Sequence, residues 1–297
     1  MDFIKNKDYM LDLCVRMAHH STALEGNTLS LNDTASILLD NYINKAMNER
    51  EFYEVRNYKE VLPLLIKSLE KEKKLDDELI KKFHKLIMKD LIHNNGKFKT
   101  IQNLIIGSNI DTTKPFLVPI KLKDLNDNLY FRFENAKNDD DKIKAILEAH
   151  IDFEKIHPFS DGNGRTGRLM IVYSCLEQNI TPIIIPKEDK ARYINILRNN
   201  DIKDFFLFSK EIQEKERERF LVFNNNALLN SFSEKLKTYN KKAKVLNPSA
   251  KAKLENEILN LHKDLEKQGI NIDDNALKTL KQIKKAKENK FIWYAFV

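Results

Sequence analysis

The stretch HPFSDGNGRTGR, residues 157–168, gathers one histidine, one acid, one asparagine, two arginines and three glycines into one short segment. The whole chain has only 7 glycines among its 297 residues, so this local concentration marks a tight turn. Because a proline disfavours helical geometry in the residue before it, the helix that approaches this stretch must end near His157. We therefore expect His157 at a helix exit, with its ring available.

The glycine-rich turn from Asp161 to Gly164 leads into a second helical segment. Glycines let backbone N–H groups converge on an anion, and the N-terminal end of a helix adds a positive field. Arg165 and Arg168 are three residues apart, so both project from one side of the first helical turn. Together these features predict a cradle for a polyanion.

Asp161 is out of place in such a cradle, because a carboxylate beside a phosphate repels it unless a cation lies between them. Mg²⁺ usually binds through one or two carboxylates together with substrate phosphates, which makes Asp161 the predicted metal ligand. The ordinary pKa of a histidine, about 6.5, suits His157 to act as a general base at neutral pH. Base, metal ligand and phosphate cradle together indicate phosphoryl or nucleotidyl transfer to a hydroxyl group.

The composition is that of a folded protein, with 42% hydrophobic and 32% charged residues. The net charge is +7, but lysines and acids are mixed along the chain, which favours solvated helix faces over a nucleic-acid surface. Cys14 and Cys175 lie in apolar helical contexts, and the N-terminus lacks the pattern of a signal peptide. No apolar run approaches the roughly 20 residues of a membrane span. We therefore expect a cytoplasmic protein that does not contact the membrane.

Apolar residues recur at helical spacing through most of the chain, notably in residues 79–91, 143–154 and 165–178. The exception is residues 98–119, where β-branched residues, a glycine and two prolines predict a short β-hairpin with an irregular return. Further along, Asn247 and Pro248 predict a helix start, Gly269 a helix end, and Asp273 the cap of another helix. We place a domain boundary near residue 244, between a main domain, 1–244, and a small helical appendage, 245–297.

The segment 157–168 resembles the signature of Fic-domain proteins, H-P-F-x-D/E-G-N-G-R-x-x-R, and matches it at every specified position. The approach, AHIDFEKI, and the continuation, LEQNITPIIIPKEDKARYINIL, are also similar to that family, as is the hairpin region, which corresponds to its flap. The resemblance covers roughly residues 10–215. It implies an all-α fold, a Fic-type helical bundle with a β-hairpin flap, and Mg²⁺-dependent transfer of AMP from ATP to a Ser, Thr or Tyr hydroxyl of a target protein.

By matched position, the resemblance implies that His157 deprotonates the target hydroxyl and that Asp161 holds Mg²⁺ against the α- and β-phosphates. Arg168 would bind the γ-phosphate. Tyr193 is a candidate for the adenine pocket, and the alternative for it is an ordinary aromatic of an amphipathic helix. The other nucleotide-binding positions are Gly162, Asn163, Gly164 and Arg165. The flap residues, which would align the target segment through added backbone hydrogen bonds, are Leu104, Ile105, Ile106 and Gly107.

A second motif, STALEG at residues 21–26, matches the inhibitory motif of the same family, S/T-x-x-x-E-G/N. Ser21 and Glu25 are four residues apart on one face of a helix predicted over about residues 10–27, and Gly26 is a helix stop. Glu25 lies at the negative end of the helix dipole, where a neighbouring cation is favoured. The resemblance implies that Glu25 pairs with Arg168, removes the partner of the γ-phosphate and so restrains the enzyme.

Several alternatives stay open at this point. Relatives transfer other phosphate-containing groups, or remove AMP at the same site; those that phosphorylate carry Lys where this chain has Gly164, so AMP transfer is favoured. Outside the enzyme class, the alternative is a DNA-binding regulator acting through the helical segment 249–290. The apolar tail FIWYAFV, residues 291–297, either contacts a partner, such as a second copy in a homodimer, or folds back on its own helices. Self-modification and the identity of the target are also open.

Overall fold

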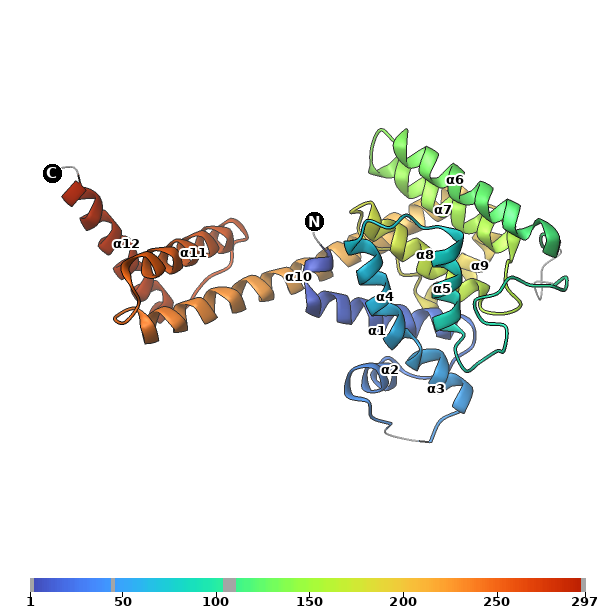
Figure 1. Cartoon of the computed structure of the whole chain (residues 1–297), viewed down its shortest axis with the longest axis horizontal. Helices are drawn as coiled ribbons and strands as arrows, with labels where there is room; N and C mark the ends of the chain where they lie inside the picture. The colour runs from blue at the N-terminus through green and yellow to red at the C-terminus, as the bar shows by residue number, and fades with distance from the viewer. Residues whose placement is uncertain (1–2, 44–45, 104–110, 295–297) are drawn as a thin grey trace. The chain divides into compact units, whose positions relative to one another are not determined.

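The computed structural model describes residues 3–43, 46–103 and 111–294, with side chains up to residue 285. Across these ranges the predicted all-α fold is confirmed, because helices dominate and no β-strand occurs (Figure 1). The helices are α1 (Lys7–Leu24), α2 (Leu31–Ala35), α3 (Glu49–Arg56), α4 (Tyr58–Glu70), α5 (Asp77–Ile87), α6 (Val118–Glu134), α7 (Asp139–Ile156), α8 (Asn163–Glu177), α9 (Lys190–Asn199), α10 (Ile202–Lys242), α11 (Pro248–Lys267) and α12 (Asp274–Tyr294).

Helix α8 lies at the centre of the helical bundle (Figure 1) and contacts α1, α4, α5 and α7. Residues 165–176 are buried without exception, so this helix is covered on every face. The sequence predicted a single apolar stripe here, formed by Leu169, Val172, Tyr173 and Leu176. The difference arises because four neighbouring helices surround α8, and its polar first turn is buried together with its apolar face.

Local signals set the ends of the helices that lead to the site. The side chain of Asn138 caps α7 by accepting a hydrogen bond from the N–H of Asp141 at 3.0 Å. Three acids, Asp139, Asp140 and Asp141, occupy its first turn, where the helix dipole favours them. At the N-terminus, α1 spans Lys7–Leu24, where the sequence predicted a helix over about residues 10–27, and Gly26 follows with φ +105°.

Residues 104–110 of the predicted β-hairpin at 98–119 lie outside the described residues, and the flap positions Leu104, Ile105, Ile106 and Gly107 are among them. Its return differs from the prediction, because a short 3₁₀ helix spans Pro115–Leu117 and α6 begins at Val118. The described chain on either side of 104–110 is joined, since the hydroxyl of Thr112 donates to the carbonyl of Asn103 at 2.7 Å. Residues 103 and 112 therefore lie side by side.

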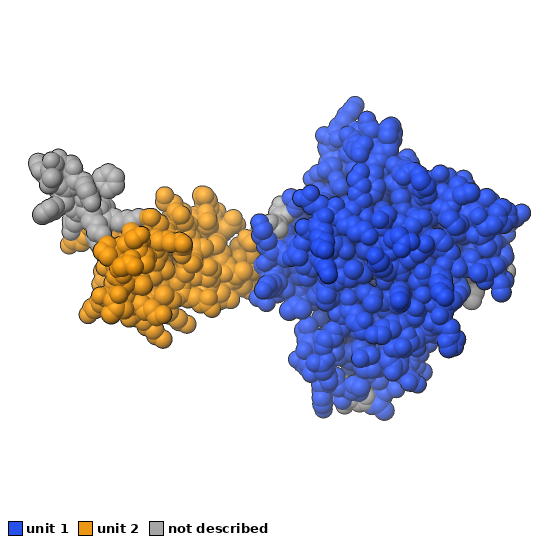
Figure 2. Space-filling view, viewed as in Figure 1, with its two compact units in different colours: residues 1–218 blue, residues 219–297 orange. Residues whose placement is uncertain are grey.

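The chain divides into two compact units, residues 1–218 and 219–297 (Figure 2). The core of the second unit is formed by Phe232, Leu236, Ile258, Leu265, Leu280 and Ile283. The division lies inside α10, upstream of residue 244, because Phe232 and Leu236 pack against α11 and α12. The predicted helix start at Asn247 is confirmed, since its side chain accepts from the N–H of Ala250 at 2.8 Å.

Cys14 and Cys175 are buried free thiols. Burial raises the pKa of each thiol to about 12, which makes both chemically inert at neutral pH. Within the described ranges, no helix has both the length and the apolar character that crossing a bilayer requires.

Candidate active site

His157 ends α7 with a left-handed backbone, at φ 49° and ψ 59°. A side chain other than glycine is uncommon in this conformation. The following proline disfavours ordinary helical geometry, so the helix ends at this residue. The ring Nδ1 lies 3.2 Å from the carbonyl oxygen of Glu154, which assigns the proton to Nδ1 and leaves a lone pair on Nε2. Burial lowers the pKa of the ring below its ordinary value. His157 is therefore neutral at pH 7 and able to accept a proton.

Asn163 closes the loop between α7 and α8. Its side-chain oxygen accepts from the N–H of Phe159 at 2.8 Å, and its side-chain nitrogen donates to the carbonyl of Phe159 at 2.8 Å. Phe159 itself is fully buried. The sequence predicted that Asn163 binds phosphate, but both ends of its amide are used inside the loop. Only the backbone N–H of Asn163 is left to face a ligand.

His84 of α5 packs against the same loop. Its ring stacks on Phe159, with centroids 3.7 Å apart and planes 6° from parallel. Nδ1 accepts from the N–H of Gly96 at 2.8 Å, so Nε2 carries the proton and donates to the carbonyl of Asp161 at 2.9 Å. Burial lowers the pKa of His84 to about 4, which keeps it neutral. Sequence reasoning missed this residue, because a histidine on an apolar helix stripe carries no distinguishing signal.

At two glycines of the loop, a Cβ would meet close neighbours. Gly162 has φ +78°, and a Cβ there would lie 2.4 Å from Sδ of Met88. A Cβ on Gly164 would lie 2.4 Å from Oε1 of Glu25 and 2.8 Å from Nη1 of Arg168. The first turn of α8 therefore presents bare backbone to the end of α1.

The structure brings Ser21, Glu25 and Arg168 together, although more than 140 residues separate the two helices in sequence. Nη2 of Arg168 donates to Oε1 of Glu25 at 2.6 Å and to the carbonyl of Ser21 at 2.9 Å. Nε of Arg168 donates to the hydroxyl of Ser21 at 3.1 Å. The guanidinium is buried, whereas 40% of the Glu25 side chain is exposed. Ser21 of α1 and the C-cap residue Glu25 thus bind Arg168, the arginine that the family resemblance assigned to the γ-phosphate.

The opposite charges of Glu25 and Arg168 shift each other's pKa. Burial raises the pKa of Glu25, but the Arg168 guanidinium outweighs it, and the net pKa lies below its ordinary value. Behind Arg168, burial raises the pKa of the Glu154 carboxyl to about 7. At neutral pH, Glu25 is therefore the charged partner of Arg168.

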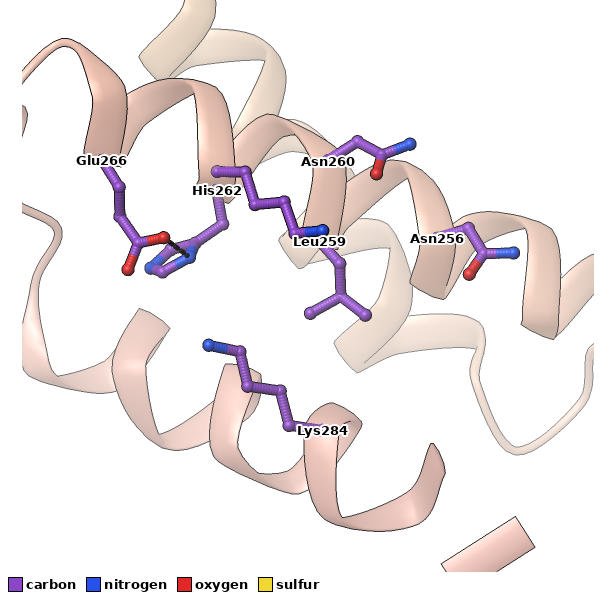
Figure 3. A pocket seen from close by; sticks show the side chains of 7 residues that line it. Asn256, Leu259, Asn260, His262, Glu266 and Lys284 are labelled. Carbon is purple, nitrogen blue, oxygen red and sulfur yellow. Dashed lines mark ion pairs between the residues drawn. The ribbon is translucent and has the colours of Figure 1, made fainter. Parts of the chain in front are cut away.

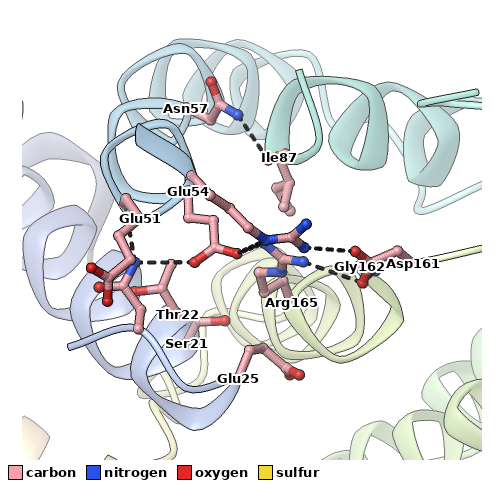
Figure 4. A network of polar contacts seen from close by, with 12 residues as sticks. Ser21, Thr22, Glu25, Glu51, Glu54, Asn57, Ile87, Asp161, Gly162 and Arg165 are labelled. Atoms are coloured by element: carbon pink, nitrogen blue, oxygen red, sulfur yellow. Dashed lines mark hydrogen bonds and ion pairs between the residues drawn. The ribbon is translucent and has the colours of Figure 1, made fainter. Parts of the chain in front are cut away.

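Arg165 belongs to a second network, drawn in Figure 4, that sequence reasoning missed. Its side chain is only 2% exposed and donates to Oε1 of Glu54 in α3 at 3.0 Å, while its Nη2 lies 3.4 Å from Oδ1 of Asp161. Oε2 of Glu54 accepts from the side-chain amide of Asn27, also at 3.0 Å. Oδ2 of Asp161 accepts from Arg50 at 2.9 Å. No local motif marks Arg50 or Glu54, because the sequence of α3 has only the mixed charges of an ordinary helix.

Tyr193 does not line an open pocket. The side chain is 1% exposed, and its hydroxyl lies 2.7 Å from Nε2 of His150. Its ring packs in the apolar core with Phe205 and lies 6.0 Å from the guanidinium of Arg168. The helical periodicity of α9 turns Tyr193 into the core, the alternative that the sequence left open, and its contact with adenine stays a prediction.

A pocket of about 310 Å³ lies in the second unit, between α11 and α12 (Figure 3). It is lined by Asn256, Leu259, Asn260, His262, Lys263, Glu266 and Lys284. The lining mixes one acid with two lysines and is open and polar, and it lacks the convergent groups of a reaction centre. The candidate active site is therefore the junction of α7 and α8.

Comparison with known proteins finds similarity over a region that includes this junction. The model of the Fic/DOC family matches residues 74–175. Protein adenylyltransferase fic-1 of Caenorhabditis elegans is 28% identical over 227 residues, covering 73% of this chain and 44% of that protein. The protein of the same name from Caenorhabditis briggsae is 26% identical over 213 residues, covering 68% of this chain and 40% of that protein. The chain thus spans about two fifths of the length of these relatives.

Solved structures share the fold. A Fic domain-containing signaling protein from Bacteroides thetaiotaomicron superposes with a TM-score of 0.64 at 21% identity, covering 72% of this chain and 87% of that one. A fragment of Fic-1 from C. elegans gives a TM-score of 0.62 at 26% identity, covering 73% and 65%. The likeness extends over most of this chain.

Proposed function

Residues 74–175 form a domain of the Fic/DOC family, and from that premise we propose that the chain is a protein adenylyltransferase. It would transfer AMP from ATP to a hydroxyl side chain of a target protein, as the names of its curated relatives indicate for them. One observation carries the proposal. A neutral imidazole, a carboxylate and the open first turn of a buried helix converge within the single loop 157–168.

The base of the reaction is His157. With Nδ1 donating to the carbonyl of Glu154, Nε2 is the atom that takes the proton of the target hydroxyl. The hydroxyl oxygen attacks the α-phosphorus, the bond from that phosphorus to the bridging oxygen breaks, and pyrophosphate leaves. The carbonyl of Glu154 then stabilises the imidazolium that forms, since a charged ring is the stronger donor.

The phosphates would lie on the N-terminal end of α8. The backbone N–H groups of residues 163–165 have no acceptor within the helix, because they belong to its first turn. The field of the helix adds to them, and Gly164 leaves the surface free of a side chain. Arg168 would bind the terminal phosphate once Glu25 has left it. The side chain of Arg165 is buried against Glu54. We therefore expect it to add positive charge near the phosphates and to keep Asp161 in position.

The residues present fit a magnesium ion bound jointly with the nucleotide. Asp161 is the one carboxylate that reaches the loop surface, with 42% of its side chain exposed, and no cluster of three or more His, Cys, Asp or Glu suited to a metal occurs among the described residues. A hard cation held by one carboxylate completes its octahedral shell with phosphate oxygens and water. When bound, magnesium would neutralise the charge of the phosphates and of the leaving pyrophosphate.

We also propose that Glu25 restrains the enzyme. Its carboxylate holds the Nη2 atom of Arg168 at 2.6 Å and lies against Gly164, where it would repel a terminal phosphate. The restraint is local, because Ser21 and Glu25 both act on this one arginine. A cytoplasmic location, modification of the chain by itself and a homodimer stay predictions.

The test is transfer of label from ATP in a cell lysate. We expect the Glu25→Gly chain with α-labelled ATP to label protein bands, or itself, well above the parent, and the double variant Glu25→Gly/His157→Ala to label none. Use of γ-labelled ATP separates phosphorylation from AMP transfer, because only phosphorylation retains the γ label. Labelling by the γ phosphate, or equal labelling by the double variant, contradicts the proposal.

A further inference from the structure

Arg50 reaches from α3 to the carboxylate of Asp161. Its Nη2 atom donates to Oδ2 of Asp161 at 2.9 Å, and its Nε atom donates to Oε1 of Glu54 at 3.2 Å. The Arg50 side chain is 54% exposed, in contrast to the buried Arg165 on the other side of the same two acids. Arg50 is thus the more exposed of the two arginines in this network.

The two oxygens of Asp161 have different partners. Oδ1 accepts from the N–H of Gly162 at 2.6 Å and faces Arg165 at 3.4 Å, so it is committed to the loop itself. Oδ2 is bound by Arg50. A cation that arrives with a nucleotide from solvent therefore finds its carboxylate oxygen already paired with a guanidinium.

We propose that Arg50 competes with magnesium for Oδ2 of Asp161, so that the magnesium–nucleotide complex binds only by displacing Arg50. This inference rests on the proposed function, because it concerns the same metal position. It is separate from the action of Glu25, which pairs with Arg168 and makes no contact with Arg50.

The charges of the network support the competition. Arg50 and Arg165 balance Asp161 and Glu54, so the four side chains sum to zero. Loss of Arg50 leaves one negative charge at the metal position. That surplus attracts magnesium and repels a nucleotide that carries no metal. If Arg50 instead bound phosphate directly, its loss would weaken the binding of the magnesium–nucleotide complex.

The experiment measures nucleotide affinity by calorimetry with α,β-methylene-ATP, whose methylene bridge blocks AMP transfer. All variants carry Glu25→Gly, so that Arg168 is free. We compare Arg50→Gln with the background chain, once in excess Mg²⁺ and once in EDTA. The matched control is Lys210→Gln, which removes a partly exposed cation paired with Asp140 at the N-terminal end of α7, away from the site.

We expect Arg50→Gln to tighten binding about two- to five-fold in Mg²⁺, the range for an exposed ion pair, and to leave it equal or weaker in EDTA. The gain disappears when Asp161→Asn is added, because the competition needs that carboxylate. Unchanged or weaker binding in Mg²⁺, or a gain of the same size in Lys210→Gln, overturns the inference about Arg50. If the Glu25→Gly background itself binds no analogue in Mg²⁺, the proposed function fails, and this inference with it.

Discussion

Replacement of Glu25 by glutamine tests the restraint most directly. The substitution keeps the size of the side chain and removes its charge, so Arg168 loses its only ionic partner from α1 while both contacts to Ser21 persist. A nucleotide that needs Arg168 no longer has to displace a carboxylate. We therefore expect tighter nucleotide binding and faster protein modification than in the parent.

The size of the effect follows from the geometry of the pair. A hydrogen bond to a charged group contributes about 1.5–3 kcal/mol. Since 40% of the Glu25 side chain is exposed, solvent screens the pair, and the lower part of this range applies. At 1.4 kcal/mol per factor of ten, about 1.5–2 kcal/mol corresponds to a roughly 10- to 30-fold decrease in the dissociation constant.

The assay is calorimetric titration of α,β-methylene-ATP with Mg²⁺ into parent and Glu25→Gln. The control is Glu70→Gln, which changes an exposed glutamate at the end of another helix, α4, and should leave the affinity unchanged. An unchanged affinity in Glu25→Gln, or an equal gain in Glu70→Gln, would refute the reasoning.

The same pair predicts a pH dependence of stability. The pKa of Glu25 in the folded protein lies below its ordinary value of 4.5, so the pair stabilises the fold fully above that pH. The stabilisation is lost as the pH falls through the depressed folded pKa. Urea unfolding should therefore show the parent as more stable than Glu25→Gln at pH 7, with the difference shrinking in acid. A difference that persists undiminished in acid contradicts the assignment of Glu25 as the charged partner.

Three further predictions address the loop and its supports. In the Glu25→Gly background, His157→Ala should lower AMP transfer by about 100- to 10,000-fold, while the nucleotide affinity measured by calorimetry stays the same. With His157 intact, the rate of transfer should fall only below pH 6.5, because burial depresses the pKa of the ring. Glu54→Gln should destabilise the fold by about 3 kcal/mol in urea unfolding, because it removes the buried partner of Arg165; a loss under 1 kcal/mol would argue against that pairing. Gly162→Ala should lower the free energy of unfolding by about 1–3 kcal/mol more than Gly26→Ala in urea unfolding. Both positions have positive φ, but only the Cβ at Gly162 meets Met88. Equal losses of stability would show that the space at Gly162 is not tight.

Much of the site was readable from local sequence. The helix exit at His157 follows from the proline after it, and the turn into α8 follows from the glycines. The stop after Leu24 and the common face of Ser21 and Glu25 follow from helical spacing and Gly26. The pairing of Glu25 with Arg168 was implied by family resemblance, and the distance of 2.6 Å agrees with it. Short-range rules suffice for the helix ends and the turn, because each of these depends on neighbours within about one helical turn.

Other features depended on packing between distant segments. Periodicity predicted one apolar stripe for α8, yet α1, α4, α5 and α7 bury it on all sides. Asn163 fits a phosphate cradle in the sequence, but its amide is used by the backbone of Phe159. Tyr193 is spaced for either a core or a pocket position, and the packing of α9 buries it beside His150.

By itself, the sequence determined the helices, their ends and the chemistry gathered between residues 157 and 168, because backbone propensity and capping act over a few residues. Tertiary structure alone decided that Arg50 and Glu54 stand against Asp161 and Arg165, more than 100 residues away. The physical reason is that a buried charge must be paired, and the partner is whichever opposite charge the packing of α3 on the bundle brings within reach. No local pattern in α3 contains that information.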